Sequence, residues 1–321
     1  MSSRFETSTF ILDNERDNRK LKVFYRSLKA YKYKRKIKSK YNADYVNTKY
    51  NTAICAIFKN EAKYLKEWIE YHLIVGIDHF YMYNNNSTDD FLSVLTPYIE
   101  SGVVTLINWT KDQAQMECYK TCINDYSKET KWLGFIDIDE FVTPIKYNSV
   151  YEFLSKFENR GSVIIFWKIF GTSGFIKRDE NSLVTNDFTV CWPKYMNVGK
   201  CFYNTKYAFN GDSENNKFLH HRLWATKNNK ELPPVDPNDN VVLNNYEKET
   251  AGFGIQINHY FTKSYNEYLE KKSKGDVYFK INPHDEEYFY EHEMKCTSTD
   301  YSAYKYLIKL KLRMENKDGR K

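Results

Sequence analysis

The sequence predicts an α/β protein whose mostly parallel sheet is flanked by helices on both faces. From residue 52 onward, short apolar runs typical of buried strands alternate with amphipathic segments typical of helices. Strands that alternate with helices pair in parallel, because each helix returns the chain to the starting edge of the sheet. Clusters of polar residues follow three of the strand ends, at 59–61, 84–90 and 137–140. Ligands bind at the carboxyl ends of such strands, so we expect these clusters to converge on one crevice.

Each element is predicted from its apolar pattern and from the polar residues that bound it. The predicted strands occupy 53–58, 79–83, 103–109, 132–138, 162–170 and 183–191. The predicted helices occupy 61–75, 91–99 and 113–126, and loops are predicted over 170–174, 210–216 and 227–240. We divide the chain into a basic N-terminal extension (1–50), the α/β domain (51–276) and a helical C-terminal tail (277–321).

Composition restricts the class of protein. Hydrophobic residues make up 41% of the 321 residues, which is ordinary for a globular core. Apolar runs such as Val163 to Trp167 are far shorter than the roughly 18 residues that span a bilayer. The polar start of the chain lacks the apolar core of a signal peptide, and the six cysteines form no CxxC pair. We therefore expect free thiols and a cytoplasmic protein.

Charge is concentrated near the N-terminus. Residues 19–40 contain eleven Lys or Arg and no acid, whereas the whole chain carries +6. Within this segment, apolar residues recur at helical spacing: Leu21, Phe24, Tyr25, Leu28 and Tyr31. The pattern predicts a basic helix that either contacts an anionic membrane surface or docks its apolar stripe on the body. No nucleic-acid-binding motif accompanies it, so nucleic acid is not an expected partner.

Three acids lie in the apolar stretch FIDIDEF, residues 135–141. On a strand, Asp137 and Asp139 would share one face about 7 Å apart, and Glu140 would face the other way and orient the loop. Two buried carboxylates on one face repel each other unless a cation compensates them. Carboxylate oxygens favour Mg2+ or Mn2+, which keep positions open for substrate phosphates. The DxD triplet therefore predicts metal-assisted phosphate chemistry.

Other phosphate and sugar chemistries suit the sequence less well. A phosphatase of the aspartyl-phosphate type needs Thr or Val where this chain has Phe141. The sequence has no GxxxxGK[ST] loop, and a glycoside hydrolase needs acids on both sides of a sugar. A nucleotidyltransferase, which also uses acids at strand ends, normally needs an early Gly-Ser loop that is not found here.

Five segments, taken in order, resemble glycosyltransferase family 92 and its family 2 relatives. They are 59–90, Gln115 with Cys122, WLGFIDIDEFVTP (132–144), FWKIFGTSG (166–174) and 257–276. The resemblance covers about residues 52–276 and implies a GT-A (Rossmann-like) fold. It implies transfer of a hexose, galactose at the family level, from a UDP-sugar to a glycan or glycoprotein acceptor. The implied cofactor is Mn2+ or Mg2+.

The resemblance also implies a role for each matching residue. Asp139 and His259 would bind the metal ion, and Asp137 would contact the donor ribose or the water shell of the metal. The other donor contacts would come from Asn60, Glu61, Asn84, Asn85, Asp89 and Lys263. The loop that would face the acceptor contains Thr172, Ser173 and Gly174, and beside it Trp167 either stacks on the acceptor sugar or packs in the core.

Two positions depart from the pattern of the family. Asn84 stands where the family usually has Asp, which removes a charge-assisted contact. The Glu-Arg-Phe strand of the family corresponds here to Asn186-Asp187-Phe188, so the acid is displaced by one residue. If transfer inverts the sugar, Asp187 is the predicted base, with Asp212 and Glu214 as rivals. This departure favours the alternative of a non-catalytic nucleotide-sugar-binding module.

Overall fold

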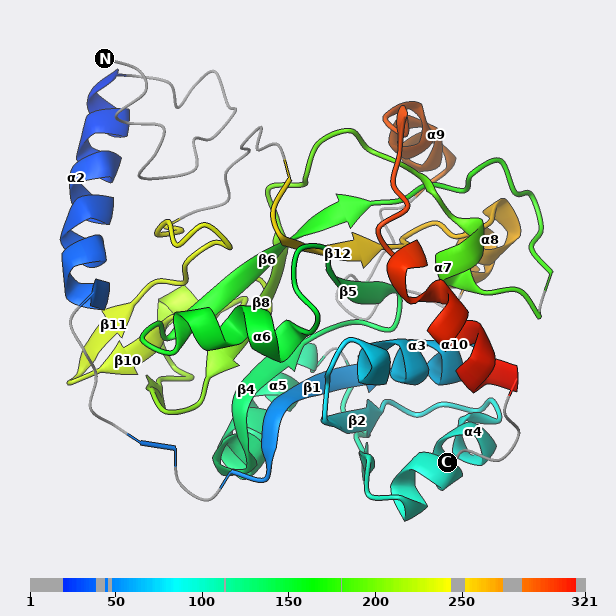
Figure 1. Ribbon diagram of the computed structural model, residues 1–321, viewed down its shortest axis with the longest axis horizontal. Helices are drawn as coiled ribbons and strands as arrows, with labels where there is room; N and C mark the ends of the chain where they lie inside the picture. The colour runs from blue at the N-terminus through cyan, green and yellow to red at the C-terminus, as the bar shows by residue number, and fades with distance from the viewer. Residues whose placement is uncertain are drawn as a thin grey trace.

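The computed structural model describes residues 20–38, 44–45, 48–112, 114–179, 181–243, 252–273 and 285–315. An eight-stranded sheet runs through the molecule in the order β3-β2-β1-β4-β8-β6-β12-β5, with helices beside it (Figure 1). Its strands are β1 (Tyr50–Phe58), β2 (His79–Asn84), β3 (Val104–Asn108), β4 (Thr130–Phe135), β5 (Glu140–Pro144), β6 (Ser162–Ile169), β8 (Gly199–Asn204) and β12 (Ile255–His259). The predicted mostly parallel α/β sheet is confirmed.

The first half of the sheet follows the prediction closely. Strands β3, β2, β1 and β4 are all parallel. They alternate with helices α3 (Ala62–Ile74), α4 (Phe91–Glu100) and α5 (Gln115–Tyr126). Residues 52–58 of β1 are all buried, as expected for a central strand covered on both faces. Gly134 in β4 is required by close packing, because a Cβ there would lie 2.4 Å from the ring of Phe202.

The second half of the sheet has mixed pairing. Strand β8 is antiparallel to both β4 and β6, β12 is parallel to β6, and β5 is antiparallel to β12. Short elements decorate this half: η1 (Ser127–Glu129), α6 (Val150–Leu154), η2 (Ser155–Phe157), β9 (Ala208–Phe209), η3 (Glu214–Asn216), β10 (Ala225–Lys227) and β11 (Lys230–Leu232). Strands β9, β10 and β11 form a small sheet, which corrects the prediction of an unstructured loop over 227–240.

Two predicted strands are wrong in ways that affect the site. Residues 183–191 form helix α7 (Val184–Asp187) and the two-residue strand β7 (Val190–Cys191). Helix α7 begins there because the buried carboxylate of Glu67 accepts hydrogen bonds from the N–H groups of Val184 and Thr185, at 2.8 and 2.9 Å. The strand predicted over 132–138 ends at Phe135, so the DxD triplet lies in the connection to β5.

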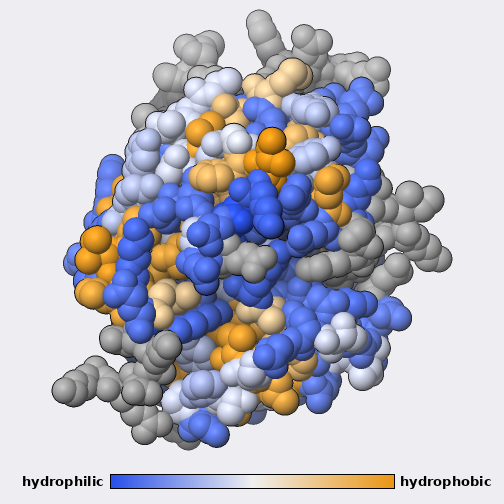
Figure 2. Space-filling model, turned by 90° about the vertical axis from the view of Figure 1, so that its right-hand side faces the viewer, coloured by the Kyte–Doolittle hydropathy of each residue, from blue (hydrophilic) through white to orange (hydrophobic). Residues whose placement is uncertain are grey.

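The C-terminal segment is helical, as predicted. It contains α8 (Tyr265–Ser273), α9 (Glu286–Met294), β13 (Ser298–Thr299) and α10 (Tyr304–Glu315). Helix α10 lies against α3 (Figure 1), with Leu307 and Leu310 buried. On the side of the molecule that carries α7, α8 and α10, hydrophobic residues form separate patches on a mostly hydrophilic surface (Figure 2).

Near the N-terminus, α2 (Lys20–Lys38) lies beside β11 (Figure 1). Its buried face carries Ala30 and Ile37, and the ring of Tyr33 packs against Trp224 at 5.6 Å. The predicted apolar stripe is not the docked face. Its four members with described side chains are 43–69% exposed: Phe24, Tyr25, Leu28 and Tyr31. The expectation that this stripe packs on the body is therefore wrong. The side chain of Leu21, the fifth member of the stripe, lies outside the described residues.

The six cysteines are free thiols, as predicted, and five of them are buried. Among the described residues, no helix is both long enough and apolar enough to cross a bilayer.

Candidate functional site

At the inner end of the DxD connection, the carboxylate of Asp137 has three side-chain hydrogen-bond donors. Asp137 accepts hydrogen bonds from Lys200 Nζ at 2.7 Å, Tyr119 Oη at 3.1 Å and Gln115 Nε2 at 3.4 Å. Lys200 also lies 3.6 Å from Glu140, and its side chain is only 1% exposed. Burial alone would lower the pKa of Lys200, but the two acids outweigh it and raise that pKa. Asp137, Glu140 and Lys200 therefore form a charge cluster in which Lys200 and Glu140 are buried and Asp137 is 34% exposed.

The backbone of the connection is also fixed from inside. Trp68 Nε1 donates to the carbonyl oxygens of Asp137 and Glu140, at 3.0 and 2.9 Å. The carboxylate of Glu140 accepts a hydrogen bond from the N–H of Asp137 at 3.0 Å, which closes the turn. The prediction that Glu140 orients the loop is confirmed. Asp137 and Asp139 do not share a strand face, because they lie in this turn and have different partners.

The outer end of the connection faces the C-terminal part of the chain. Lys271 Nζ on α8 lies 2.5 Å from Asp139 Oδ2, and His259 Nε2 lies 3.7 Å from the same oxygen. Burial alone would raise the pKa of Asp139, but Lys271 and His259 hold that pKa well below its usual range. Burial lowers the pKa of His259, which favours the neutral imidazole. The structure therefore brings Asp139 and His259 together, as the sequence predicts.

The donor atoms of this pair suit a divalent cation. Neutral imidazole and carboxylate are both ligands for such ions, and an ion with bonds of about 2.1 Å bridges atoms up to about 4.2 Å apart. The separation of 3.7 Å between His259 Nε2 and Asp139 Oδ2 lies within that limit. Asp137 is directed instead at Lys200 and Tyr119, so Asp139 and His259 are the residues that would hold the ion.

Two further charges face Asp139 from neighbouring loops. Lys263 is buried and lies over the ring of Tyr64 at 4.3 Å. Burial lowers the pKa of Lys263, although Asp139 and Glu61 act in the opposite direction. Lys263 has φ of 51°, a left-handed conformation that is uncommon outside glycine and that clusters at functional sites. Glu61 and Lys263 thus lie near the DxD connection, where the prediction places the donor.

The predicted donor contacts on the loops after β1 and β2 accept hydrogen bonds from the backbone of these same loops. Asn60 Oδ1 accepts a hydrogen bond from the N–H of Thr88 at 2.7 Å, and Asp89 accepts one from the N–H of Ala62 at 2.7 Å. Asn84 Oδ1 accepts from the N–H of Ser87 at 2.9 Å. These bonds hold the two strand ends together at one edge of the sheet.

Asn85 is buried, and its Nδ2 donates to the carbonyl oxygens of Trp109 and Lys111, at 2.9 and 3.0 Å. The side chain of Asn85 therefore links the loop after β2 to the loop after β3. A nucleoside contact by Asn60, Asn84, Asn85 or Asp89 stays a prediction.

On the predicted acceptor side, the ring of Trp167 contacts both His259, a predicted metal ligand, and His221. Its ring lies 4.6 Å from that of His259 and 5.1 Å from that of His221. Trp167 Nε1 is buried with no hydrogen-bond partner among the described residues. The ring of His220 lies 3.8 Å from that of His221 and 5.7 Å from that of Tyr119. Burial lowers the pKa of His221 to about 3.

The 172–174 loop is held by its neighbours. Glu293 on α9 accepts hydrogen bonds from Thr172 N and Oγ1, at 2.9 and 2.7 Å. Ser173 Oγ accepts hydrogen bonds from the N–H groups of Thr189 and Val190, at 2.9 and 3.0 Å. Gly174 has φ of 84° and open space around its missing Cβ, so the loop can approach a ligand there.

The three predicted bases are not joined to Asp139 by these contacts. Asp187 lies at the end of α7 and accepts hydrogen bonds from Ser182 Oγ and from Asn186 Nδ2. Asp212 lies in an exposed turn, and Glu214 begins η3. Because Asp187 is on a helix rather than a strand, the one-residue strand slip predicted for it does not apply. The identity of the base stays a prediction.

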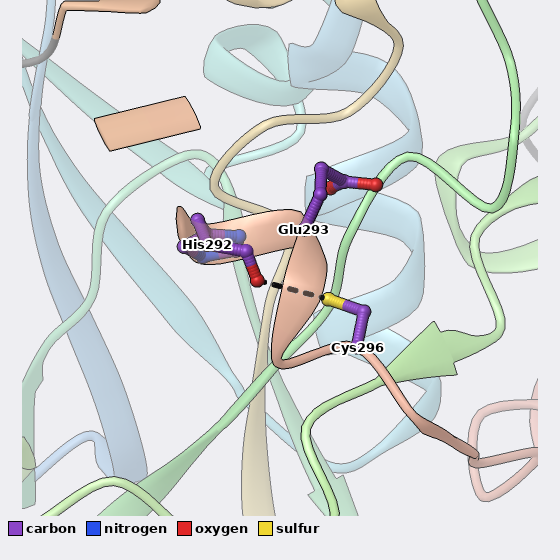
Figure 3. Close-up of side chains that lie close together, drawn as sticks. All are labelled: His292, Glu293 and Cys296. Carbon is purple, nitrogen blue, oxygen red and sulfur yellow. Dashed lines mark hydrogen bonds between the residues drawn. The ribbon is translucent and has the colours of Figure 1, made fainter. Parts of the chain in front are cut away.

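A second cluster of metal-binding residue types, at the end of α9, is better explained as structural. The ligand atoms of His292, Glu293 and Cys296 lie within 4.8 Å of one another (Figure 3). Both oxygens of Glu293 bind Thr172, and Cys296 Sγ donates to the carbonyl of His292 at 3.6 Å. Burial raises the pKa of Cys296 to about 12.

The sequence analysis missed Lys200 and Lys271. Lys200 carried a usable signal, because a lysine inside a strand as apolar as GKCFYN needs a buried acid as its partner. Lys271 had no such signal, since it lies among other lysines in EYLEKKSKG.

Fold and site together define an α/β protein with a charged ligand site at the carboxyl edge of its parallel strands. A family model described as "Glycosyltransferase family 92" matches residues 48–288, about three quarters of the chain. The chain belongs to glycosyltransferase family 92.

Individual relatives are distant and much longer than the matched segment. A glycosyltransferase family 92 protein of Oryza sativa subsp. japonica is 33% identical over 104 residues, which is 32% of this chain and 18% of that protein. Galactan beta-1,4-galactosyltransferase GALS3 of Arabidopsis thaliana is 31% identical over 36% of this chain and 26% of its own length. Beta-1,4-galactosyltransferase galt-1 of Caenorhabditis elegans is 31% identical over 33% of this chain and 28% of its own length. The chain thus aligns with less than a third of the length of each.

Among solved structures, S. aureus TarS 1-349 is similar with a TM-score of 0.35 and 13% identity. The similarity covers 59% of this chain and 61% of that one. The identification of the family rests on the family model.

Proposed function

We propose that this chain is a metal-dependent hexosyltransferase that uses a UDP-sugar, with galactose as the favoured sugar, and a glycan or glycoprotein acceptor. The family model supports the enzyme class, and the names of two relatives favour galactose. The observation that carries the proposal is that Asp139 Oδ2 and His259 Nε2 lie 3.7 Å apart beside two lysines. A carboxylate, an imidazole and lysines at one point suit an anionic diphosphate bound through a cation.

In the proposed mechanism, Asp139 and His259 would hold a divalent ion, Mn2+ or Mg2+, and such an ion would supply positive charge for the leaving diphosphate. Lys263 stabilises the same charge as it develops. Lys200 orients Asp137 by a 2.7 Å hydrogen bond, so that the exposed part of its carboxylate can accept a hydrogen bond from a ribose hydroxyl. For transfer with inversion, an acid on the acceptor side takes the proton of the attacking hydroxyl, and Asp187 is the proposed residue.

A second candidate function is a nucleotide-sugar-binding module without transfer activity. It is favoured by the position of Asp187, whose carboxylate binds Ser182 and Asn186 at the end of α7. A nucleotidyltransferase is the less favoured enzyme class, for lack of a Gly-Ser loop early in the site. Hydrolysis of UDP-galactose by the purified chain with Mn2+ separates these functions, since a transferase slowly transfers its donor sugar to water and a binding module does not.

The replacement Asp139→Ala tests the site itself. We expect it to remove Mn2+-dependent UDP binding, measured by calorimetry, because a first ligand of the ion is lost. Asp187→Asn is the matched control, and we expect it to leave UDP binding intact while lowering transfer. Unchanged UDP affinity in Asp139→Ala, with a normal circular dichroism spectrum, would contradict the proposed site.

We also propose that the protein is cytoplasmic and contacts an anionic membrane surface through α2. The support is that Phe24, Leu28 and Tyr31 are exposed on a helix that carries only basic charges. We expect the triple replacement of these residues by Ser to weaken binding to vesicles that contain phosphatidylserine while turnover in solution is unchanged. Ile308→Ser with Leu312→Ser on α10 changes similarly exposed side chains and is the control. Equal vesicle binding by all three proteins would contradict the membrane contact.

A further inference from the structure

Asp139, His259 and Lys271 meet at a single oxygen atom. Lys271 Nζ lies 2.5 Å from Asp139 Oδ2, and His259 Nε2 lies 3.7 Å from that oxygen. The position next to Asp139 Oδ2 is where a divalent ion held by Asp139 and His259 would lie. An ammonium group and a divalent ion repel each other at such short range, so this oxygen cannot keep Lys271 as its partner and also bind the ion at no cost.

Lys271 is the charged group at this point that has room to move. Its side chain is 42% exposed, its ammonium group lies over the ring of Phe261 at 4.5 Å, and the acid Glu61 is a further charged neighbour. Lys200, by contrast, is 1% exposed and lies between Asp137 and Glu140. A lysine has a flexible four-carbon stem, so Lys271 can redirect its ammonium group by rotating about its own side-chain bonds.

We infer that Lys271 is a displaceable counter-ion: it neutralises Asp139 while the site holds no donor and turns to the donor diphosphate when a metal ion takes its place. This inference rests on the proposed function. An arriving nucleotide diphosphate is an acceptor-rich anion that offers the ammonium group new partners. Binding of metal and donor is then coupled, because the donor compensates the lysine that the metal displaces.

The replacement Lys271→Met tests the inference by binding measurements alone. We expect Mn2+ without nucleotide to bind Lys271→Met about tenfold or more tightly than wild type, since a competing cation is gone. We expect UDP, at saturating Mn2+, to bind Lys271→Met about tenfold more weakly, and uridine to bind both proteins equally. Electron paramagnetic resonance of free Mn2+ and calorimetry with UDP and uridine measure these affinities.

Lys63→Met is the matched control. Lys63 is 45% exposed and forms a 2.7 Å ion pair with Glu270 on α8, so its loss removes the same charge from the same neighbourhood. We expect both affinities in this variant to stay within about twofold of wild type.

Three results would overturn the inference. The first is a Mn2+ affinity in Lys271→Met that is equal to or weaker than wild type. The second is an unchanged UDP affinity. The third is UDP binding by wild type that is equally tight with and without chelator but lost in Lys271→Met, since Lys271 would then be a permanent substitute for the metal. If wild type binds no UDP at all, the proposed function fails, whereas the measurement with Mn2+ alone still tests the competition.

Discussion

The two ends of the DxD connection carry similar ion pairs in different surroundings. At the inner end, Asp137 pairs with Lys200, whose side chain is 1% exposed and fixed between two acids. At the outer end, Asp139 pairs with Lys271, whose side chain is 42% exposed. The acids follow the opposite order, since the side chain of Asp137 is 34% exposed and that of Asp139 is 12% exposed, so the difference between the two ends lies in the lysines. A buried lysine cannot leave its partners cheaply, whereas a half-exposed lysine is readily solvated. The inner pair therefore shapes the connection, and the outer pair is available for exchange with ligands.

The largest expected effect is that of Lys200→Met on stability. Removing the buried cation leaves Asp137 and Glu140 uncompensated, which costs about 3 kcal/mol of the free energy of unfolding. The same replacement at Lys271 is the control, and we expect a smaller cost, because that lysine is half-exposed and His259 and Lys263 remain beside Asp139. Urea denaturation at pH 7 measures both values. Equal losses in the two variants would break the distinction between a fixed inner pair and an exchangeable outer pair.

A smaller effect is the dependence of stability on pH, which tests the packing behind the inner end of the DxD connection. His72 on α3 lies behind it, where Nε2 accepts the N–H of Val142 at 3.2 Å and Nδ1 bonds the carbonyl of Trp68 at 2.8 Å. Burial lowers the pKa of His72 from 6.5 to about 3, and protonation would remove the acceptor for Val142. The unfolded chain binds this proton first, so stability is complete above pH 6.5 and falls as the pH drops towards 3.

Between pH 6.5 and pH 5, we expect His72 to contribute a loss of about 2 kcal/mol in the free energy of unfolding. In His72→Phe this contribution is absent, so the variant loses less stability than wild type over the same interval. His79, whose pKa burial lowers to about 4, remains in both proteins and contributes to the pH dependence of stability that is left in the variant. Parallel pH dependence in wild type and His72→Phe would show that the imidazole does not hold β5 in the neutral form.

The sequence best predicts the first half of the sheet, in which each strand and helix shows its own hydrophobic pattern over a short stretch of chain. Each of β1, β2 and β3 is followed by its own helix, and each strand is short, apolar and bounded by polar residues. Hydrophobic periodicity reports such units directly. The convergence of Asp139 and His259 was implied by the family resemblance, and the structure explains it, because one follows β4 and the other ends β12 at the same edge of the sheet.

What the sequence could not show depends on partners distant in the chain. Residues 183–187 read as a strand, but the carboxylate of Glu67, more than 100 residues earlier, starts a helix there. The exposed stripe of α2 has the same spacing as a docked one, and only the packing of Ala30 and Ile37 shows which face is covered. The pairing of Lys200 with Asp137 depends on β8 entering the sheet beside β4, which no local pattern encodes.

That insertion of β8 has a consequence for synthesis. A nascent chain that has left the ribosome only as far as residue 198 has made β1 to β4, yet the strand that covers the open flank of β4 is still inside the exit tunnel. Until it emerges, the growing polypeptide exposes an unpaired flank of β4 and leaves Asp137 and Glu140 without Lys200, and such half-built sheets are prone to aggregate. The exit of β8 from the ribosome therefore protects this flank of the sheet, while the far flank of β6 still waits for β12.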